Sequence, residues 1–273
     1  MRLTRVFIDG ALSAGSLVEL TRDTGAHLVK VLRARSGDEL VLFNGDGREY
    51  DGTIESVRGA RVSASIGAAR SVARESPFSL TLVQCVPRGD RMDFIVQKAT
   101  ELGVASIVPV LSRRSVVRLD AEQAASKQAH WRAVAVSACE QCGRNRLPTV
   151  EAPQALLAYL GALQPPDASG EFLRLVLEPE RASQRSHAAR SHAARSIDVD
   201  NAAANSAQIA IGPEGGFTPE ELEAFELSAF ARLGLGPRVL RTETAAIAAI
   251  AVLQARFGDM SVVSDDSSRS ADS

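Results

Sequence analysis

The chain has 273 residues and a formal net charge of −2. Its length and its 45% hydrophobic content suffice for a substantial core in one large or two modest domains. No apolar run approaches the roughly 20 residues of a membrane helix, and the first nine residues lack a signal peptide's apolar centre, so we predict a soluble cytoplasmic protein. Three cysteines, Cys85, Cys139 and Cys142, are too few and too uneven for a disulfide framework. We expect no metal site and interpret Cys139 and Cys142 as small helix residues.

Residues 1–72 have the pattern of a small β-barrel. Short apolar runs lie at 6–8, 39–43, 53–57 and 61–66, and Asn44-Gly45-Asp46-Gly47 is a strong hairpin signal. A short helix is expected at 27–33. Residues 1–36 carry six basic residues against three acidic ones, a local balance of +3. Such a surface suits RNA phosphates, although an ordinary solvated surface fits the same count.

Residues 77–260 alternate between strands and helices. The pattern predicts strands at 80–86, 106–111, 173–177, 208–211 and 238–240, and helices at 92–102 and 121–141. This alternation is typical of an α/β domain with a mainly parallel sheet. Residues 181–206, where Arg185-Ser186-His187-Ala188-Ala189 is repeated directly, are interpreted as a low-complexity insertion, and residues 261–273 as a disordered tail.

Two loops of this second domain have the composition of a ligand site. Gly212-Pro213-Glu214-Gly215-Gly216 follows an apolar strand, and Thr218-Pro219-Glu220-Glu221 then predicts a helix with a capping box. Leu240-Arg241-Thr242-Glu243-Thr244-Ala245 opens an apolar helix, with Thr242 or Thr244 as the expected cap. Helix starts present unpaired N–H groups, so two such loops close together can hold a small ligand. Dinucleotide and P-loop motifs are absent from the sequence.

Several motifs together match those of a known enzyme family. They are the two loops just described and the segments Gly89–Gly103, Arg113-Arg114-Ser115, Glu140–Arg146 and Leu177-Glu178-Pro179. The chain resembles the 16S ribosomal RNA (uracil-N3)-methyltransferases of the SPOUT superfamily, from Arg2 to about Phe257. The insertion after Pro179 departs from the family pattern. The resemblance implies a PUA-like RNA-binding β-barrel followed by a SPOUT-type α/β domain with a carboxyl-terminal trefoil knot, working as a homodimer.

The resemblance also implies a cofactor, S-adenosylmethionine, and a reaction, methylation of N3 of one uridine in the 16S rRNA of the small ribosomal subunit. By motif match, the residues that would line the cofactor site are Leu177, Gly212, Pro213, Glu214, Gly215, Gly216, Leu235, Gly236, Leu240, Arg241, Thr242, Glu243, Thr244 and Ala245.

Uracil N3 holds a proton at neutral pH, so the enzyme must favour its loss. Arg241, as first choice, and Arg114 are candidates for stabilising the uracil anion, while Glu101, Glu140 or Glu243 are candidates for accepting the proton. An ion-pair or capping role stays open for each glutamate. The expected RNA contacts are Arg2, Arg5, Lys30 and Arg33 on the barrel, and Lys98, Arg113, Arg114, Arg144 and Arg146 near the catalytic side.

Two alternatives stay open from the sequence. A related SPOUT enzyme would methylate a ribose 2′-oxygen or another base. A non-catalytic RNA-binding ribosome assembly factor would keep the basic barrel, yet it would have no use for two intact cofactor loops.

Overall fold

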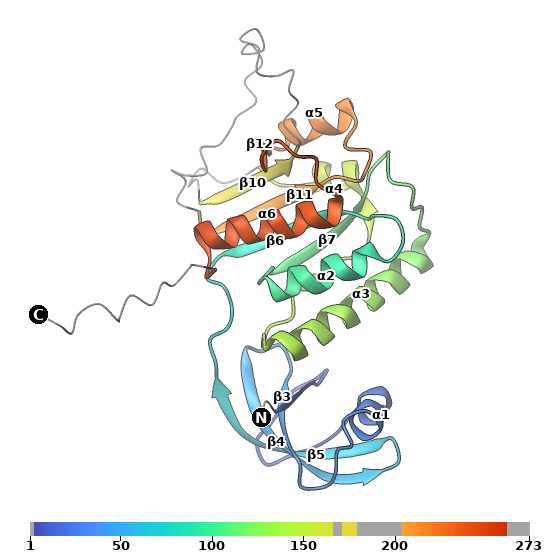
Figure 1. Cartoon of the computed structure of the whole chain (residues 1–273), viewed down its shortest axis with the longest axis vertical. Coiled ribbons are helices and arrows are strands. Elements are labelled where there is room, and N and C mark those ends of the chain that lie inside the picture. Colours follow the sequence, from blue (N-terminus) through green and yellow to red (C-terminus); the bar gives the residue numbers. More distant parts are fainter. Residues whose placement is uncertain (1–2, 166–170, 179–203, 261–273) are drawn as a thin grey trace, which may run out of the picture. The chain divides into compact units, whose positions relative to one another are not determined.

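The computed structural model describes residues 3–165, 171–178 and 204–260, which form two compact units (Figure 1). The first unit runs to Glu75 and includes Arg132–Pro148; the second comprises Ser76–Trp131 and the described residues from Thr149 onward. The predicted RNA contact Arg2, most of the predicted insertion and the predicted disordered tail lie outside the described residues. The two consecutive domains expected from the sequence, 1–72 and 77–260, stay a prediction.

The first unit is built on a five-stranded sheet with the order β1-β3-β4-β5-β2. Its elements are β1 (Thr4–Phe7), β2 (Leu17–Glu19), α1 (Arg22–Lys30), β3 (Glu39–Phe43), β4 (Arg48–Arg58) and β5 (Arg61–Ser71). The predicted hairpin joins β3 to the antiparallel β4, and Gly45 and Gly47 both have a φ of 92°, which favours glycine. Helix α1 begins earlier than the sequence predicted because Thr21 caps it, its hydroxyl accepting from the Thr24 N–H at 3.3 Å.

Two arginines expected to contact RNA are instead buried inside the first unit. Arg5, 8% exposed, forms an ion pair with Glu49 and donates to the Asn145 side-chain oxygen at 2.6 Å. Arg144, 6% exposed, donates to a carboxylate oxygen of Glu75 at 2.9 Å. Phosphate binding by Arg5 and Arg144 stays a prediction, and it would require both guanidinium groups to leave these buried partners. Arg5, on β1, joins the segment after helix α3 (Ala121–Cys142) to Glu49 on β4, and Arg144 joins the same segment to Glu75.

The buried carboxylate of Glu49 predicts a specific acid sensitivity. Burial alone would raise the pKa of Glu49, but hydrogen bonds from Arg74 and Arg5 outweigh it and lower this pKa below its ordinary value of 4.5. A lowered folded-state pKa stabilises the fold above the unfolded-state pKa, and this contribution is lost as the pH falls through the folded-state value.

We therefore expect Glu49→Gln to lower the free energy of unfolding by about 3 kcal/mol at pH 7, since it leaves two cations without their partner. As the pH falls below 4.5, the ordinary pKa of this group, the wild type should lose more stability than the variant. Denaturant unfolding measured across that range checks this, with Glu55→Gln, an exposed position of the same strand, as control. Parallel pH profiles for wild type and Glu49→Gln would contradict the role given to the ion pair.

The second unit is a parallel sheet covered by helices on both faces. Its strands are β6 (Ser79–Cys85), β7 (Ser106–Leu111), β8 (Thr149–Val150), β9 (Gln154–Ala155), β10 (Phe172–Leu177), β11 (Ser206–Ile211) and β12 (Ala231–Leu233), in the order β12-β10-β11-β6-β7-β8 with β9 also on β7. Helices α2 (Arg91–Glu101) and α6 (Thr242–Phe257) cover one face, and α4 (Leu156–Ala162) and α5 (Pro219–Leu227) cover the other (Figure 1). Short apolar strands of this kind are buried on both faces, as the sequence indicated.

One predicted strand is wrong. Residues 238–240 form no strand; the chain pairs with β10 earlier, at Ala231–Leu233, with Ala231 opposite Leu175. Gly236, with a φ of 72°, and Pro237 then turn the chain away from the sheet. Val239 is 83% exposed, so its apolar side chain is not part of a buried strand.

Helix α3 contributes residues to both units. Trp131 is 2% exposed and its indole N–H donates to Asp93 at 3.1 Å, so its ring is packed inside the second unit. Cys139 and Cys142 are both helical. Burial raises the pKa of Cys139 to about 12, so its thiol stays protonated at neutral pH. Within the described residues, no helix is both long and apolar enough to span a bilayer.

Candidate functional site

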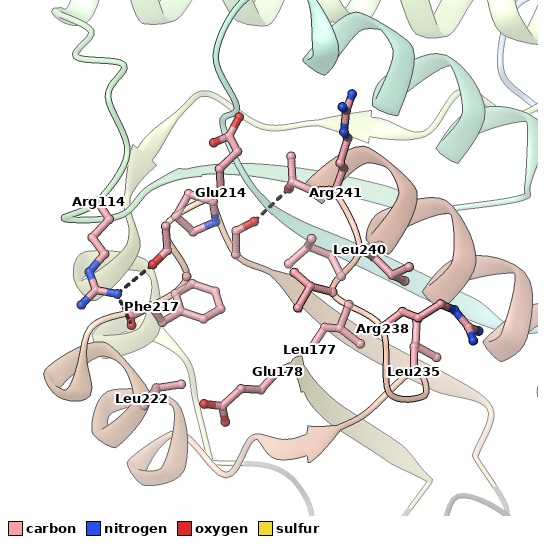
Figure 2. A pocket seen from close by; sticks show the side chains of 18 of the residues that line it. Arg114, Leu177, Glu178, Glu214, Phe217, Leu222, Leu235, Arg238, Leu240 and Arg241 are labelled. Carbon is pink, nitrogen blue, oxygen red and sulfur yellow. Dashed lines mark hydrogen bonds between the residues drawn. The ribbon is translucent and has the colours of Figure 1, made fainter. Parts of the chain in front are cut away.

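A cavity of about 470 Å³ opens at the carboxyl ends of β10 and β11, in the second unit (Figure 2). Ligands of open parallel sheets bind at this edge, and the volume lies in the usual range for small-molecule sites. The lining residues are Arg114, Leu177, Glu178, Ile211, Gly212, Pro213, Glu214, Gly215, Gly216, Phe217, Leu222, Leu235, Gly236, Arg238, Val239, Leu240, Arg241, Thr242 and Ala245. Both loops predicted from the sequence therefore meet at one cavity.

The glycine-rich loop has a conformation that larger residues would disturb. Gly216 has a φ of 68°, and its N–H donates to Pro213 O at 2.8 Å, closing a tight turn. A Cβ at Gly212 would lie 3.1 Å from the Phe217 ring. The capping box is confirmed: the Thr218 hydroxyl accepts from the Glu221 N–H, and Glu221 accepts from the Thr218 N–H at 2.8 Å.

Helix α6 is not capped by a threonine, which corrects the prediction. Arg241 occupies the N-cap position without a side-chain cap, and Thr242 is the first helical residue. The Thr242 hydroxyl instead donates to Gly212 O at 2.8 Å and accepts from the buried Gln84 amide at 3.0 Å. Thr242 thus joins the two loops to each other and to the end of β6, and the first N–H groups of α6 have no side-chain cap beside the cavity.

The carboxylate of Glu221 joins a third segment to the glycine-rich loop. Glu221 has no exposed surface, and it also accepts from the Arg113 N–H at 2.7 Å. The next residue, Arg114, donates to Gly215 O at 2.7 Å and to Phe217 O at 3.3 Å (Figure 2). The loop after β7 is therefore fixed to the glycine-rich loop by both backbone and side chain.

The two candidate catalytic arginines differ in how they are used. The guanidinium of Arg114 is committed to the loop carbonyls. Arg241 is exposed, and its side chain extends away from the apolar wall formed by Leu177 and Leu240 (Figure 2). It has no hydrogen bond or ion pair within the described ranges. Arg238 also lines the cavity, is exposed and has no hydrogen bond or ion pair among the described residues, so Arg241 and Arg238 are both available to a second molecule.

None of the three candidate proton acceptors lines the cavity. Glu101 is ion-paired with Lys98 at 2.8 Å, Glu243 lies in the first turn of α6 outside the lining, and Glu140 belongs to the first unit. Among the described residues, the carboxylates at the cavity are Glu178, paired with Arg232 at 2.9 Å, and Glu214, paired with Arg91.

Twelve of the fourteen residues expected to hold the cofactor line the cavity; Glu243 and Thr244 do not. The residues that the sequence analysis did not assign are Glu178, Ile211, Phe217, Leu222, Arg238 and Val239. Of these, Glu178 and Arg238 lie close in the sequence to residues that were expected to hold the cofactor. Leu222 lies in helix α5, and nothing in the sequence indicated that it would line a ligand cavity. The lining of this cavity depends on folding as well as on motifs.

The remaining predicted RNA contacts have different environments. Lys30, Arg33, Arg113 and Arg146 are exposed, and Arg113 is ion-paired with Glu220 at 2.9 Å. Lys98 is half-buried and paired with Glu101. Exposed arginines can bind phosphate, whereas Lys98 would first have to leave its partner.

Comparisons with known proteins match both units. Residues 74–254 match the model of an RNA methyltransferase domain, and residues 20–66 match that of an RNA methyltransferase PUA domain. The chain is 32% identical over 235 residues to ribosomal RNA small subunit methyltransferase E of Bacillus subtilis, covering 86% of this chain and 88% of the relative.

Two solved structures are similar over nearly the whole chain. A methyltransferase from Legionella pneumophila in complex with S-adenosylmethionine is 39% identical, with a TM-score of 0.82 over 95% of this chain and all of the other. Ribosomal RNA small subunit methyltransferase E of Neisseria gonorrhoeae, bound to S-adenosylmethionine, is 34% identical with a TM-score of 0.79 and the same coverage.

A PUA-like unit, a parallel α/β unit and a glycine-lined cavity at its sheet edge define the class of RNA methyltransferases. Within that class, the chain belongs to the ribosomal RNA small subunit methyltransferase E family.

Proposed function

We propose that this protein is an S-adenosylmethionine-dependent methyltransferase that methylates N3 of one uridine in the 16S rRNA of the small ribosomal subunit. The observation that carries the proposal is the cavity where the loops 212–217 and 235–242 meet, in a chain similar to structures solved with S-adenosylmethionine. It acts in the cytoplasm, where ribosomal RNA is found, and the expected trefoil knot belongs to this proposal.

The residues of the cavity fit this cofactor chemically. Leu177, Leu235 and Leu240 offer apolar walls to an adenine ring, and loop backbone groups are available to its polar edge. Glu178 and Glu214, although each is ion-paired with an arginine, offer carboxylate oxygens as acceptors for the ammonium group of the cofactor. The uncapped start of α6 suits a carboxylate.

The bound cofactor supplies a methyl group already activated on sulfur. The chain's own residues then have to hold the uracil base and favour loss of its N3 proton. Arg241 stabilises the negative charge that develops on the uracil carbonyl oxygens. Arg114 is a positioning residue, since its guanidinium fixes the carbonyls of the glycine-rich loop. The base must be unpaired to present N3.

We also propose that the working unit is a homodimer. Large apolar side chains on the second unit are exposed, among them Leu227 at 84%, Val239 at 83% and Val252 at 48%. A second copy that covers such side chains would remove them from water. Light scattering should give twice the 28.9 kDa of one chain, and a monomer mass would reject the dimer.

The substrate class is tested by methyl transfer from labelled S-adenosylmethionine to purified ribosomal subunits. We expect label in the RNA of small subunits that lack the modification and none in large subunits. Equal labelling of both would reject the substrate, and absent transfer together with absent cofactor binding would favour a non-catalytic assembly factor.

A further inference from the structure

A second cavity, of about 540 Å³, lies within the first unit between β1, α1 and the last turns of α3. It is lined by Leu3, Thr4, Arg5, Val6, Asp23, Thr24, His27, Leu28, Leu32, Ser137, Glu140 and Gln141. The floor is apolar, with Val6 2% and Leu28 1% exposed, and Leu3 and Leu32 are over 40% exposed. The cavity therefore offers apolar contact to the faces of a flat group.

The polar side chains of this cavity have unused hydrogen-bonding capacity. The half-buried Glu140 accepts from the Phe7 N–H at 3.0 Å through one carboxylate oxygen. In the described part of the chain, its other oxygen and the side chains of Asp23, His27 and Gln141 have no hydrogen bond or ion pair. Burial raises the pKa of Glu140, against the lowering effects of the Phe7 N–H, His27 and Arg5. Asp23, His27 and Gln141 are exposed and reach water in the free protein, so donors from a ligand would replace water at these groups and at Glu140.

The charges at this cavity disfavour a phosphate. Two carboxylates, Asp23 and Glu140, line it, and its one arginine, Arg5, is buried and neutralised by Glu49. A ligand that suits the cavity is flat, apolar on its faces and has an N–H donor on its edge. Unpaired RNA bases have these properties, and Glu or Asp accepts from the cytosine N4 amino group.

We propose that this cavity binds the base of an unpaired cytidine in the RNA substrate, with Glu140 accepting from its N4 amino group. The proposal rests on the proposed function in one respect, namely that the substrate is RNA. It adds a base-reading site to a unit whose RNA contacts were expected from basic residues alone.

The test compares short single-stranded oligo(C) and oligo(U), because cytosine and uracil differ at position 4, where an amino donor replaces a carbonyl acceptor. Binding is measured by fluorescence anisotropy to the whole protein without S-adenosylmethionine. We expect oligo(C) to bind about tenfold more tightly than oligo(U). Glu140→Gln, which keeps an oxygen for the Phe7 N–H, should abolish that preference.

The matched control is Glu122→Gln, the same chemical change at an exposed position of α3 outside the cavity, which should keep the wild-type preference. Ser137→Trp, at an exposed position, should fill the cavity and weaken oligo(C) binding even if Glu140→Gln fails to fold. Equal binding of the two oligonucleotides by the wild type, or a preference that survives in Glu140→Gln, would overturn the proposal. Methyl transfer without any cytosine preference would leave the proposed function standing and reject this site alone.

Discussion

Replacing Arg241 by alanine is expected to lower kcat for methyl transfer at least about 100-fold, the usual loss when a group that stabilises developing charge is removed. Arg241 lines the cavity, is exposed, and has no internal partner in the described part of the chain. Its guanidinium is therefore free to meet the uracil oxygens. Because the charge develops only during the reaction, the dissociation constant for S-adenosylmethionine should change less than about threefold.

The measurement is single-turnover transfer at saturating cofactor, with cofactor affinity determined by calorimetry. Arg256→Ala, at the far end of the same helix, serves as the control. A variant that transfers methyl groups at nearly the wild-type rate would remove Arg241 from the reaction. Loss of cofactor binding instead of turnover would make it a cofactor-binding residue.

The second large effect is expected at Glu221. This carboxylate is fully buried and accepts from the backbone N–H groups of Arg113 and Thr218. Glu221→Ala leaves both donors without their partner, which should lower the free energy of unfolding by about 2–4 kcal/mol. Because the glycine-rich loop loses its link to the loop after β7, affinity for S-adenosylmethionine should fall about tenfold or more.

The neighbouring Glu220 provides the matched comparison. Its side chain is 55% exposed and is paired with the equally exposed side chain of Arg113. Glu220→Ala should therefore change stability by less than about 1 kcal/mol. Thermal unfolding and calorimetric titration of both variants check this contrast, and equal effects of the two substitutions would show that the buried carboxylate does not organise the loop.

Local sequence signals predicted the start of α5 correctly. Thr218 and Glu221 make a capping box whose partners are three residues apart, so its geometry needs no other part of the chain. The second role of Glu221, as acceptor for the Arg113 N–H, joins segments 108 residues apart and has no local signal. The same holds for Thr242, which bonds to Gly212 and Gln84 where the local pattern indicated a cap.

The apolar pattern and the count of basic residues each led to one misleading expectation, and the structure gives a physical reason for both. Val239 and Leu240 are apolar, as residues of a buried strand are, but in the structure they line the cavity and form no strand. Arg5 counts toward a basic surface, yet it is buried against Glu49. Neither composition nor spacing distinguishes a side chain that faces a ligand from one that faces the core.

The most direct test of the central claim identifies the methylated nucleoside. Small ribosomal subunits lacking the modification are incubated with the protein and labelled S-adenosylmethionine, and the RNA is digested to nucleosides and analysed by chromatography and mass spectrometry. The label is expected in N3-methyluridine. Label in a 2′-O-methylated nucleoside or in another base would contradict the assigned target atom.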